Sequence, residues 1–332
     1  MSFVYNFSQM NAKDKEIYQQ IYEGLCAYSP RIKINRTSRE QACELYAAVL
    51  NDHPELSIVD NSALNFEYNA VEFYLLPGYW FCQQDIYNNH MQFLEECEFI
   101  VNKIVSPSMP EIEREIAIHD FLCRNIEYGY YDTDNNMGGK LSQSAFCTLF
   151  ERKGVCKGIS MLFKCLMDLA DIKTIVIEGE INDSGWEPHA WNIVLMNNHF
   201  SHVDITKDIC IYRENDIMAY HGFNFSDGEA NGKYRWNHSQ YPVCDSNVNG
   251  YYEWKHLIIN DEIQMENMID KSISKGSRII QFKIQKGSYL SCFSKENIAQ
   301  KIVDYISQKT QKDILIKYIF DENSGKVVVE VE

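Results

Sequence analysis

Cys156 lies in a segment whose residue types favour nucleophilic chemistry. Gly154 and Gly158 flank it, and a periodic apolar stripe follows at Ile159, Leu162, Phe163, Leu166 and Ala170. This spacing predicts a helix that begins at or near Cys156. Free backbone N–H groups and the positive end of the dipole at a helix start favour the thiolate, which is the nucleophilic form of cysteine. The same local pattern also fits a small buried cysteine, the commoner environment for this residue.

A histidine and an aspartate follow on a predicted β-hairpin. Residues 189–196 and 199–205 are typical of two strands, and Asn197-Asn198 is typical of a two-residue turn between them. That turn sets a register in which Trp191 faces Asp204, so Asp204 lies diagonally from His189 on one face of the sheet. A slip of one residue would separate the two side chains. The pattern therefore predicts a nucleophile, a base and an orienting carboxylate.

These motifs, in this order, resemble the transglutaminase-like superfamily. The resemblance rests on Gly-Val-Cys-x-Gly at 154–158, His-Ala-Trp-Asn at 189–192 and His-Val-Asp at 202–204, and it is strongest over residues 115–208. Residues 52–56 and 76–79 are similar to an N-terminal extension common in bacterial members. The resemblance implies a papain-like fold with Cys156 as nucleophile, His189 as general base and acid, and Asp204 as orienting carboxylate. Three departures from the family pattern affect the expected substrate subsites but not the triad. They are Ser160, Lys207 and Ala145-Phe146-Cys147.

The chemistry that this triad implies is acyl transfer through a thioester. The substrate would be a peptide or protein amide, with water as the most favoured acceptor and an amine as the alternative. The backbone N–H of Cys156 is the expected first oxyanion donor, Gln143 is a candidate for the second, and Trp191 is a candidate wall of the site. We expect no cofactor and no metal; the oligomeric state is not predicted.

Two other classes of function compete with this interpretation. A zinc site could draw on His199, His202, Asp204 and a cysteine, but His199 and His202 differ in parity on a strand and would point to opposite faces. His202 and His119 are expected to have structural roles. A non-catalytic interaction module that keeps the fold without turnover is the remaining alternative.

Composition limits the partners and the compartment. The 332 residues carry a formal net charge of −16, which disfavours nucleic acid and anionic membrane surfaces and suggests a preference for neutral or basic peptides. The 11 cysteines form no C-x-x-C pair, as expected for reduced thiols. The first residues show no secretory leader, so a cytoplasmic location is expected unless a leader has been removed. No apolar run approaches the ~20 residues of a membrane span.

The chain is predicted to be α+β and to contain three domains. They are an N-terminal α+β extension at 1–104, a catalytic domain at 105–262 in which the nucleophile's helix packs on an antiparallel sheet, and a small C-terminal α/β domain at 263–332. Helices are expected at 13–28, 39–50, 111–123, 145–152 and 295–307. Strands are expected at 66–76, 173–179, 278–284, 314–320 and 326–331, with Pro77-Gly78 as a turn and a long loop region over 211–260.

Overall fold

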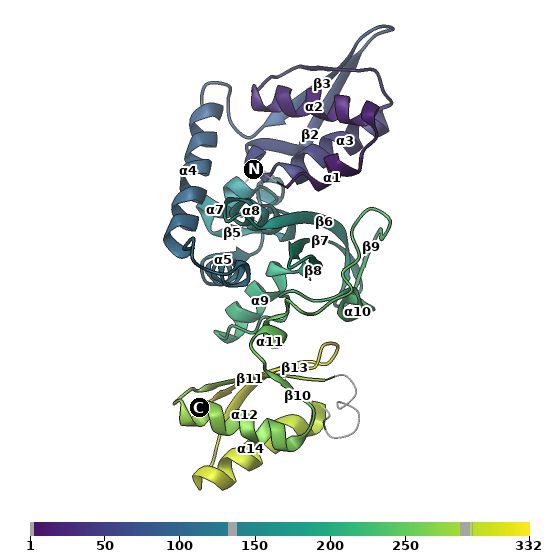
Figure 1. Cartoon of the computed structure of the whole chain (residues 1–332). Coiled ribbons are helices and arrows are strands. Elements are labelled where there is room, and N and C mark those ends of the chain that lie inside the picture. The colour runs from purple at the N-terminus through teal and green to yellow at the C-terminus, as the bar shows by residue number, and fades with distance from the viewer. Residues whose placement is uncertain (1–2, 132–137, 286–292, 294) are drawn as a thin grey trace.

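The computed structural model describes residues 3–131, 138–285, 293 and 295–332. Figure 1 shows three regions that follow one another along the long axis of the molecule: the N-terminal segment, a central region that contains α8, and the C-terminal unit at the opposite end. The mixture of helices with largely antiparallel sheets agrees with the predicted α+β class. Residues 132–137 and one cysteine, Cys292, lie outside the described residues.

The N-terminal segment packs helices against a three-stranded antiparallel sheet of order β1-β3-β2. Asn11 and Ser38 begin two of the helices, because their side chains accept hydrogen bonds from the backbone N–H groups of Asp14 and Gln41. The elements are α1 (Tyr5–Gln9), α2 (Ala12–Cys26), β1 (Ile32–Ile34), α3 (Arg39–Asp52), η1 (Pro54–Leu56), β2 (Val59–Tyr68), β3 (Phe73–Tyr79) and α4 (Ile86–Ile104).

Two features of this segment differ from the sequence prediction. Pro77-Gly78 is not a turn but part of β3, where Pro77 pairs with Leu64. Strand β1 pairs with β3 only at residues 73–75, so Pro77 lies beyond that ladder and its missing N–H costs no bond to β1. The chain reverses instead at Asn69, whose side chain accepts from the N–H groups of Val71 and Glu72. Helix α4 was not expected at all.

The central region places helix α8 against a four-stranded antiparallel sheet of order β8-β7-β6-β9. Its elements are α5 (Glu111–Asn125), β4 (Glu127–Tyr128), α6 (Gly138–Leu141), α7 (Ala145–Glu151), β5 (Lys153–Gly154), α8 (Cys156–Leu169), β6 (Lys173–Asn182), β7 (Trp186–Met196), β8 (His199–Val203), α9 (Ile205–Asn215), α10 (Asp227–Ala230), β9 (Tyr234–Trp236) and α11 (Tyr251–Trp254).

The predicted hairpin register is confirmed. Asn192 pairs with Val203 and Met196 pairs with His199, as the two-residue turn requires. Asn197 and Asn198 both have positive φ angles, 52° and 63°, which is the geometry of a type I′ turn. The predicted second strand, however, ends two residues early. Asp204 is the N-cap of α9, because its side chain accepts a hydrogen bond from the backbone N–H of Lys207.

The C-terminal unit forms a separate four-stranded sheet of order β10-β11-β13-β12, covered by two helices. Its elements are β10 (Ile258–Ile259), α12 (Glu262–Ser274), β11 (Ile279–Ile284), α14 (Lys295–Thr310), β12 (Ile316–Asp321) and β13 (Lys326–Val331). Among the described helices, none combines the length and apolar character needed to cross a bilayer.

The hydrophobic cores show how the regions are joined. One cluster of buried residues runs from Ile17 in α2, through α4 and α8, to Tyr252 in α11, so the N-terminal segment and the central region share a core. The C-terminal unit has its own core. A further small cluster, built on Ile217, Ala219 and Val328, lies where that unit meets the central region. The domain boundaries at residues 104 and 262 stay predictions.

Candidate active site

Cys156 is the first residue of α8, and no side chain caps this helix start. The thiol is partly exposed. The loop before α7 is held against it, since Val155 N–H donates to the carbonyl of Ser142 at 2.9 Å. Gly158 permits this close approach, because a Cβ there would lie 2.6 Å from the same carbonyl oxygen. The helix amino terminus therefore leaves backbone donors beside the sulfur.

Two side chains fix α8 to the strand that carries His189. Ser160 Oγ donates to the carbonyl of Ala190 at 3.0 Å, and Asn192 Nδ2 donates to the carbonyl of Ser160 at 3.0 Å. All three residues are buried. These bonds set the position of Cys156 relative to His189, and they give Ser160, which departs from the family pattern, a structural reason.

His189 and Asp204 are in direct contact. His189 Nε2 donates to Asp204 Oδ2 at 2.9 Å, which leaves Nδ1 as the basic nitrogen. Asp204 is 1% exposed and accepts two further hydrogen bonds, from the hydroxyl of Tyr234 at 2.8 Å and from Lys207 N–H at 3.2 Å. Three donors therefore hold the carboxylate that orients the imidazole.

The charges of this pair follow from its surroundings. Burial alone would raise the pKa of Asp204, but His189 and the hydrogen bonds from Tyr234 and Lys207 outweigh it and lower that pKa. Burial would lower the pKa of His189, but Asp204 and then a hydrogen bond with Cys156 raise it to about 10. The site thus favours an imidazolium between a carboxylate and the cysteine sulfur.

The other two candidate residues are Trp191, which contacts His189, and Gln143, which lies on the loop before α7. Trp191 is fully buried, and its ring stacks behind the His189 imidazole with centroids 5.9 Å apart. Gln143 is exposed and follows Ser142, whose carbonyl contacts the chain at Val155. The role of Gln143 as an oxyanion donor stays a prediction.

A cleft of about 730 Å³ opens beside His189 and Asp204. The C-terminal unit forms one wall of it through Ile319, Phe320, Asp321, Glu322 and Asn323. Asp321 pairs with Lys207 on α9 at 2.7 Å, three residues from the catalytic carboxylate candidate. The end of β12 is therefore attached directly to the helix that begins at Asp204.

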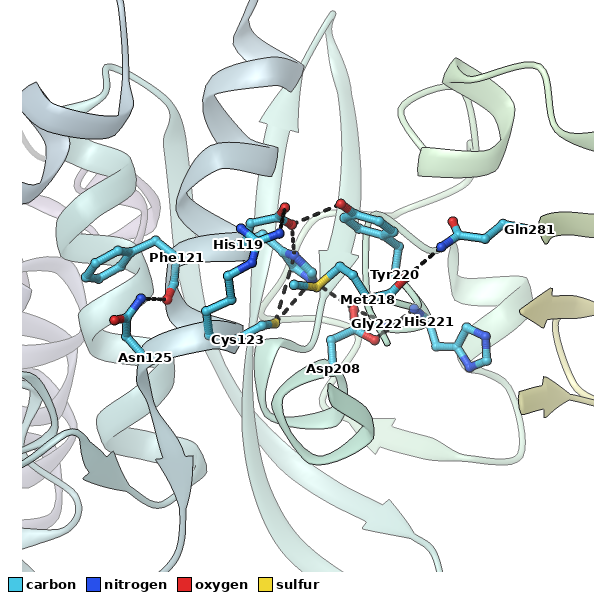
Figure 2. Close-up of polar contacts among 12 residues, drawn as sticks. His119, Phe121, Cys123, Asn125, Asp208, Met218, Tyr220, His221, Gly222 and Gln281 are labelled. Carbon is cyan, nitrogen blue, oxygen red and sulfur yellow. Dashed lines mark hydrogen bonds and ion pairs between the residues drawn. The ribbon is translucent and has the colours of Figure 1, made fainter. Parts of the chain in front are cut away.

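A second buried histidine and carboxylate link α5 to α9 (Figure 2). His119 on α5 contacts Asp208 on α9 at 3.0 Å, and neither side chain is exposed. Asp208 also accepts hydrogen bonds from the backbone N–H groups of His221 and Gly222. Burial would lower the pKa of His119, but Cys123, Asp120 and Asp208 raise it well above its usual value. The structural interpretation of His119 agrees with this complete burial.

Sequence reasoning missed Tyr234 and Asp321 as site residues. Tyr234 lies in the aromatic stretch at 211–260, whose composition predicted a loop region around a site but no particular residue. Asp321 lies between the predicted strands at 314–320 and 326–331 of the C-terminal unit. No local signal connects it to α9, because the contact depends on how two units pack.

Comparison with known proteins identifies the central region. Residues 98–205 match the Transglutaminase-like superfamily. This part of the chain belongs to that superfamily. The matched transglutaminase-like segment contains Cys156, His189 and Asp204. Members of the superfamily are typically cysteine-dependent enzymes.

Solved structures give more distant similarities. A proposed cysteine protease from Cytophaga hutchinsonii is 16% identical over 44% of this chain and 62% of its own, with a TM-score of 0.29. A proposed protease from Parabacteroides distasonis is 10% identical over 43% and 39%, with a TM-score of 0.26. A TGase is 14% identical over 53% and 50%, with a TM-score of 0.28. The chain thus spans less than two thirds of each, and no curated protein matches it.

Proposed function

We propose that the chain is a cysteine-dependent acyl-transfer enzyme that acts on peptide or protein amide bonds, with water as the usual acceptor. The observation that carries this proposal is the 2.9 Å hydrogen bond between His189 and Asp204. His189 lies on β7, the strand that is fixed to the helix of Cys156. The raised pKa of His189, about 10, supports a protonated imidazole beside Cys156 at neutral pH, which is the acid that the leaving amine needs.

In the first half of the reaction, Cys156 Sγ bonds to the amide carbonyl carbon and the carbonyl π electrons move to oxygen. The backbone N–H of Cys156 at the start of α8 would stabilise this oxyanion. The C–N bond then breaks, and the nitrogen leaves with the proton from His189. The products are a thioester, a free amine and a neutral imidazole.

In the second half, water adds to the thioester carbonyl and gives a proton to His189. The C–S bond breaks, the carboxylic acid leaves, and the thiolate and imidazolium are restored. A primary amine in place of water would give a new amide instead, and the triad is compatible with either acceptor. Asp204 keeps the imidazole in the tautomer whose Nδ1 faces the reaction throughout.

The test compares wild type with Cys156→Ala on a mixed peptide library, with and without an added primary amine, by mass spectrometry. We expect product masses from hydrolysis in both conditions, and a loss on the order of 10³-fold or more in the variant. Cys43→Ala, at an exposed cysteine on α3, is the matched control and should keep wild-type rates. The absence of any mass change that depends on Cys156 would overturn the proposal and favour an interaction module.

A further inference from the structure

Trp191 forms the surface on which the candidate catalytic imidazole rests. It lies two residues after His189 on β7, so both side chains share one face of the strand. The two rings are nearly parallel, with an angle of 18° between their planes and 5.9 Å between their centroids. An indole face attracts a cation, so this contact stabilises the protonated form of His189. The orientation of the indole therefore matters to the charge of the imidazole.

His202 and Asp227 hold the indole in this plane. Trp191 Nε1 donates to His202 Nδ1 at 3.0 Å, and His202 Nε2 contacts Asp227 Oδ1 at 2.8 Å. An indole N–H can only donate, so Nδ1 of His202 is unprotonated and the proton is on Nε2, which donates to the carboxylate. Each nitrogen in this chain therefore has a single role: Trp191 Nε1 donates, His202 Nδ1 accepts and His202 Nε2 donates. His202 is fully buried, as is Trp191.

Asp227 is itself fixed to the main chain. Its Oδ2 accepts from Cys244 N–H at 3.2 Å, and its own N–H donates to the Cys244 carbonyl at 2.7 Å. His202 is held in the same way, by two backbone hydrogen bonds with Phe225 at 2.8 and 2.9 Å. Backbone hydrogen bonds with Cys244 and Phe225 therefore hold both Asp227 and His202 in place.

The same residues could be read as a cation site, because ligand atoms of His202, Asp227 and Cys244 lie within 4.8 Å of one another. The hydrogen bonds disfavour that reading. A metal on Nε2 would move the proton of His202 to Nδ1, where it would face the N–H of Trp191. Burial also raises the pKa of the Cys244 thiol, which opposes the thiolate that a metal needs. The group fits a hydrogen-bonded network better than a metal centre.

We propose that His202 and Asp227 are positioning residues for His189, acting through Trp191. This inference rests on the proposed function, since it assigns a role in the same reaction. The network keeps the indole parallel to the imidazole while Asp204 holds the imidazole edge. Nδ1 of His189 then keeps its direction toward Cys156, and the imidazolium is stabilised. Neither His202 nor Asp227 touches the reacting atoms.

The experiment compares His202→Phe with His202→Asn. Phenylalanine fits the aromatic surroundings of Phe225 and Trp236 but removes both hydrogen bonds, whereas asparagine can keep an acceptor where Nδ1 stood. The readouts are kcat/KM against pH, the alkylation rate of Cys156 by iodoacetamide, and the thermal midpoint. We expect His202→Phe to lower kcat/KM about ten-fold and to move its alkaline limb to lower pH. His202→Asn should retain most of the wild-type rate and pH limb.

The outcomes separate the two proposals. A wild-type Cys156 that neither turns over peptides nor reacts faster than the other cysteines overturns the proposed function itself. If the wild type is active and His202→Phe has the same rate and the same alkaline limb, only the positioning role is overturned. The same holds if His202→Phe changes nothing except the thermal midpoint. Should His202→Phe not fold, Trp191→Phe, which keeps a ring but loses the N–H, is expected to give the same shift of the alkaline limb. Loss of wild-type activity on chelation, with restoration by zinc, would overturn the network in favour of a metal site.

Discussion

Asp204 is the residue on which the candidate site depends most directly. One of its oxygens accepts from both His189 and Tyr234, and the other accepts from the first turn of α9. The carboxylate is thus both the partner of the imidazole and the cap of a helix. A substitution that keeps its shape but removes its charge separates these two roles, since an amide oxygen can still accept hydrogen bonds.

At the scale of single residues, we predict that Asp204→Asn changes the pH dependence of kcat/KM. Protonated His189 is the acid that the leaving amine needs, so wild-type kcat/KM should fall as pH rises through about 10. Asp204 is the largest cause that raises this pKa, while burial lowers it. The Asn variant should therefore lose activity at a lower pH, with kcat/KM reduced on the order of 10²–10⁴-fold. Asp245→Asn, at an exposed site, is the control, and an unchanged alkaline limb in Asp204→Asn would contradict the assignment.

The residues of this pair could be predicted from sequence because the hairpin is governed by local geometry. Two consecutive asparagines tolerate positive φ, and their turn fixes which residues face each other. Tyr234 could not be predicted in the same way. It reaches Asp204 because β9 adds to the edge of the sheet beside β6, and three residues of weak periodicity do not specify such a pairing.

Helix α9 is the element that joins the candidate site to its support. Its N-cap is Asp204, and one turn later Asp208 contacts His119 and binds the backbone of residues 221–222. The loop at residues 221–222 also contacts the start of α9, because Asp204 N–H donates to the carbonyl of Gly222 at 2.8 Å. The sequence pattern favours a strand through residue 205 and a loop from 211, because α9 has only a weak apolar stripe.

Gly222→Ala tests the close approach of this loop to Asp204. A Cβ at residue 222 would lie 2.2 Å from the backbone oxygen of Asp204, so one of the two segments must move. We expect the free energy of unfolding to fall by about 1–3 kcal/mol and kcat/KM to fall with it, as the carboxylate shifts from His189. Gly228→Ala is the matched control, because its nearest neighbour is 3.7 Å away. Equal behaviour of the two variants in urea unfolding and in turnover would refute this role for Gly222.

At the scale of the whole molecule, the C-terminal unit forms part of the cleft. Its own core is separate, but Asp321, Lys317 and Gln281 reach across to the central region. Figure 1 shows that β13 lies close to the α11 end of the central region. The separate unit itself was evident from strand periodicity at 278–331. Its position could not be predicted, because no sequence pattern pairs the polar side chains Asp321, Lys317 and Gln281, or the small apolar patch around Val328, with their partners in the central region.

The charge of the cleft gives the prediction for substrate choice. Lys207 and Lys233 line the cleft but pair with Asp321 and Asp183, whereas Glu187 and Glu214 are exposed and form no ion pair with a described residue. A lysine-rich peptide should therefore be preferred over a neutral one of equal length. Glu187→Gln with Glu214→Gln should reduce that preference about five-fold, as expected for the loss of ~1 kcal/mol from exposed charges.

Salt provides the independent check on this electrostatic preference. Raising the ionic strength should weaken turnover of the lysine-rich peptide by wild type and have little effect on the double variant, because exposed charges are screened within about 10 Å at 0.1 M. Glu95→Gln with Glu98→Gln removes two exposed carboxylates from α4 and changes the net charge equally. If that control loses the preference as much as the cleft variant, the selectivity comes from the charge of the whole surface rather than from the cleft. If neither variant changes the preference for the lysine-rich peptide, Glu187 and Glu214 do not select the substrate.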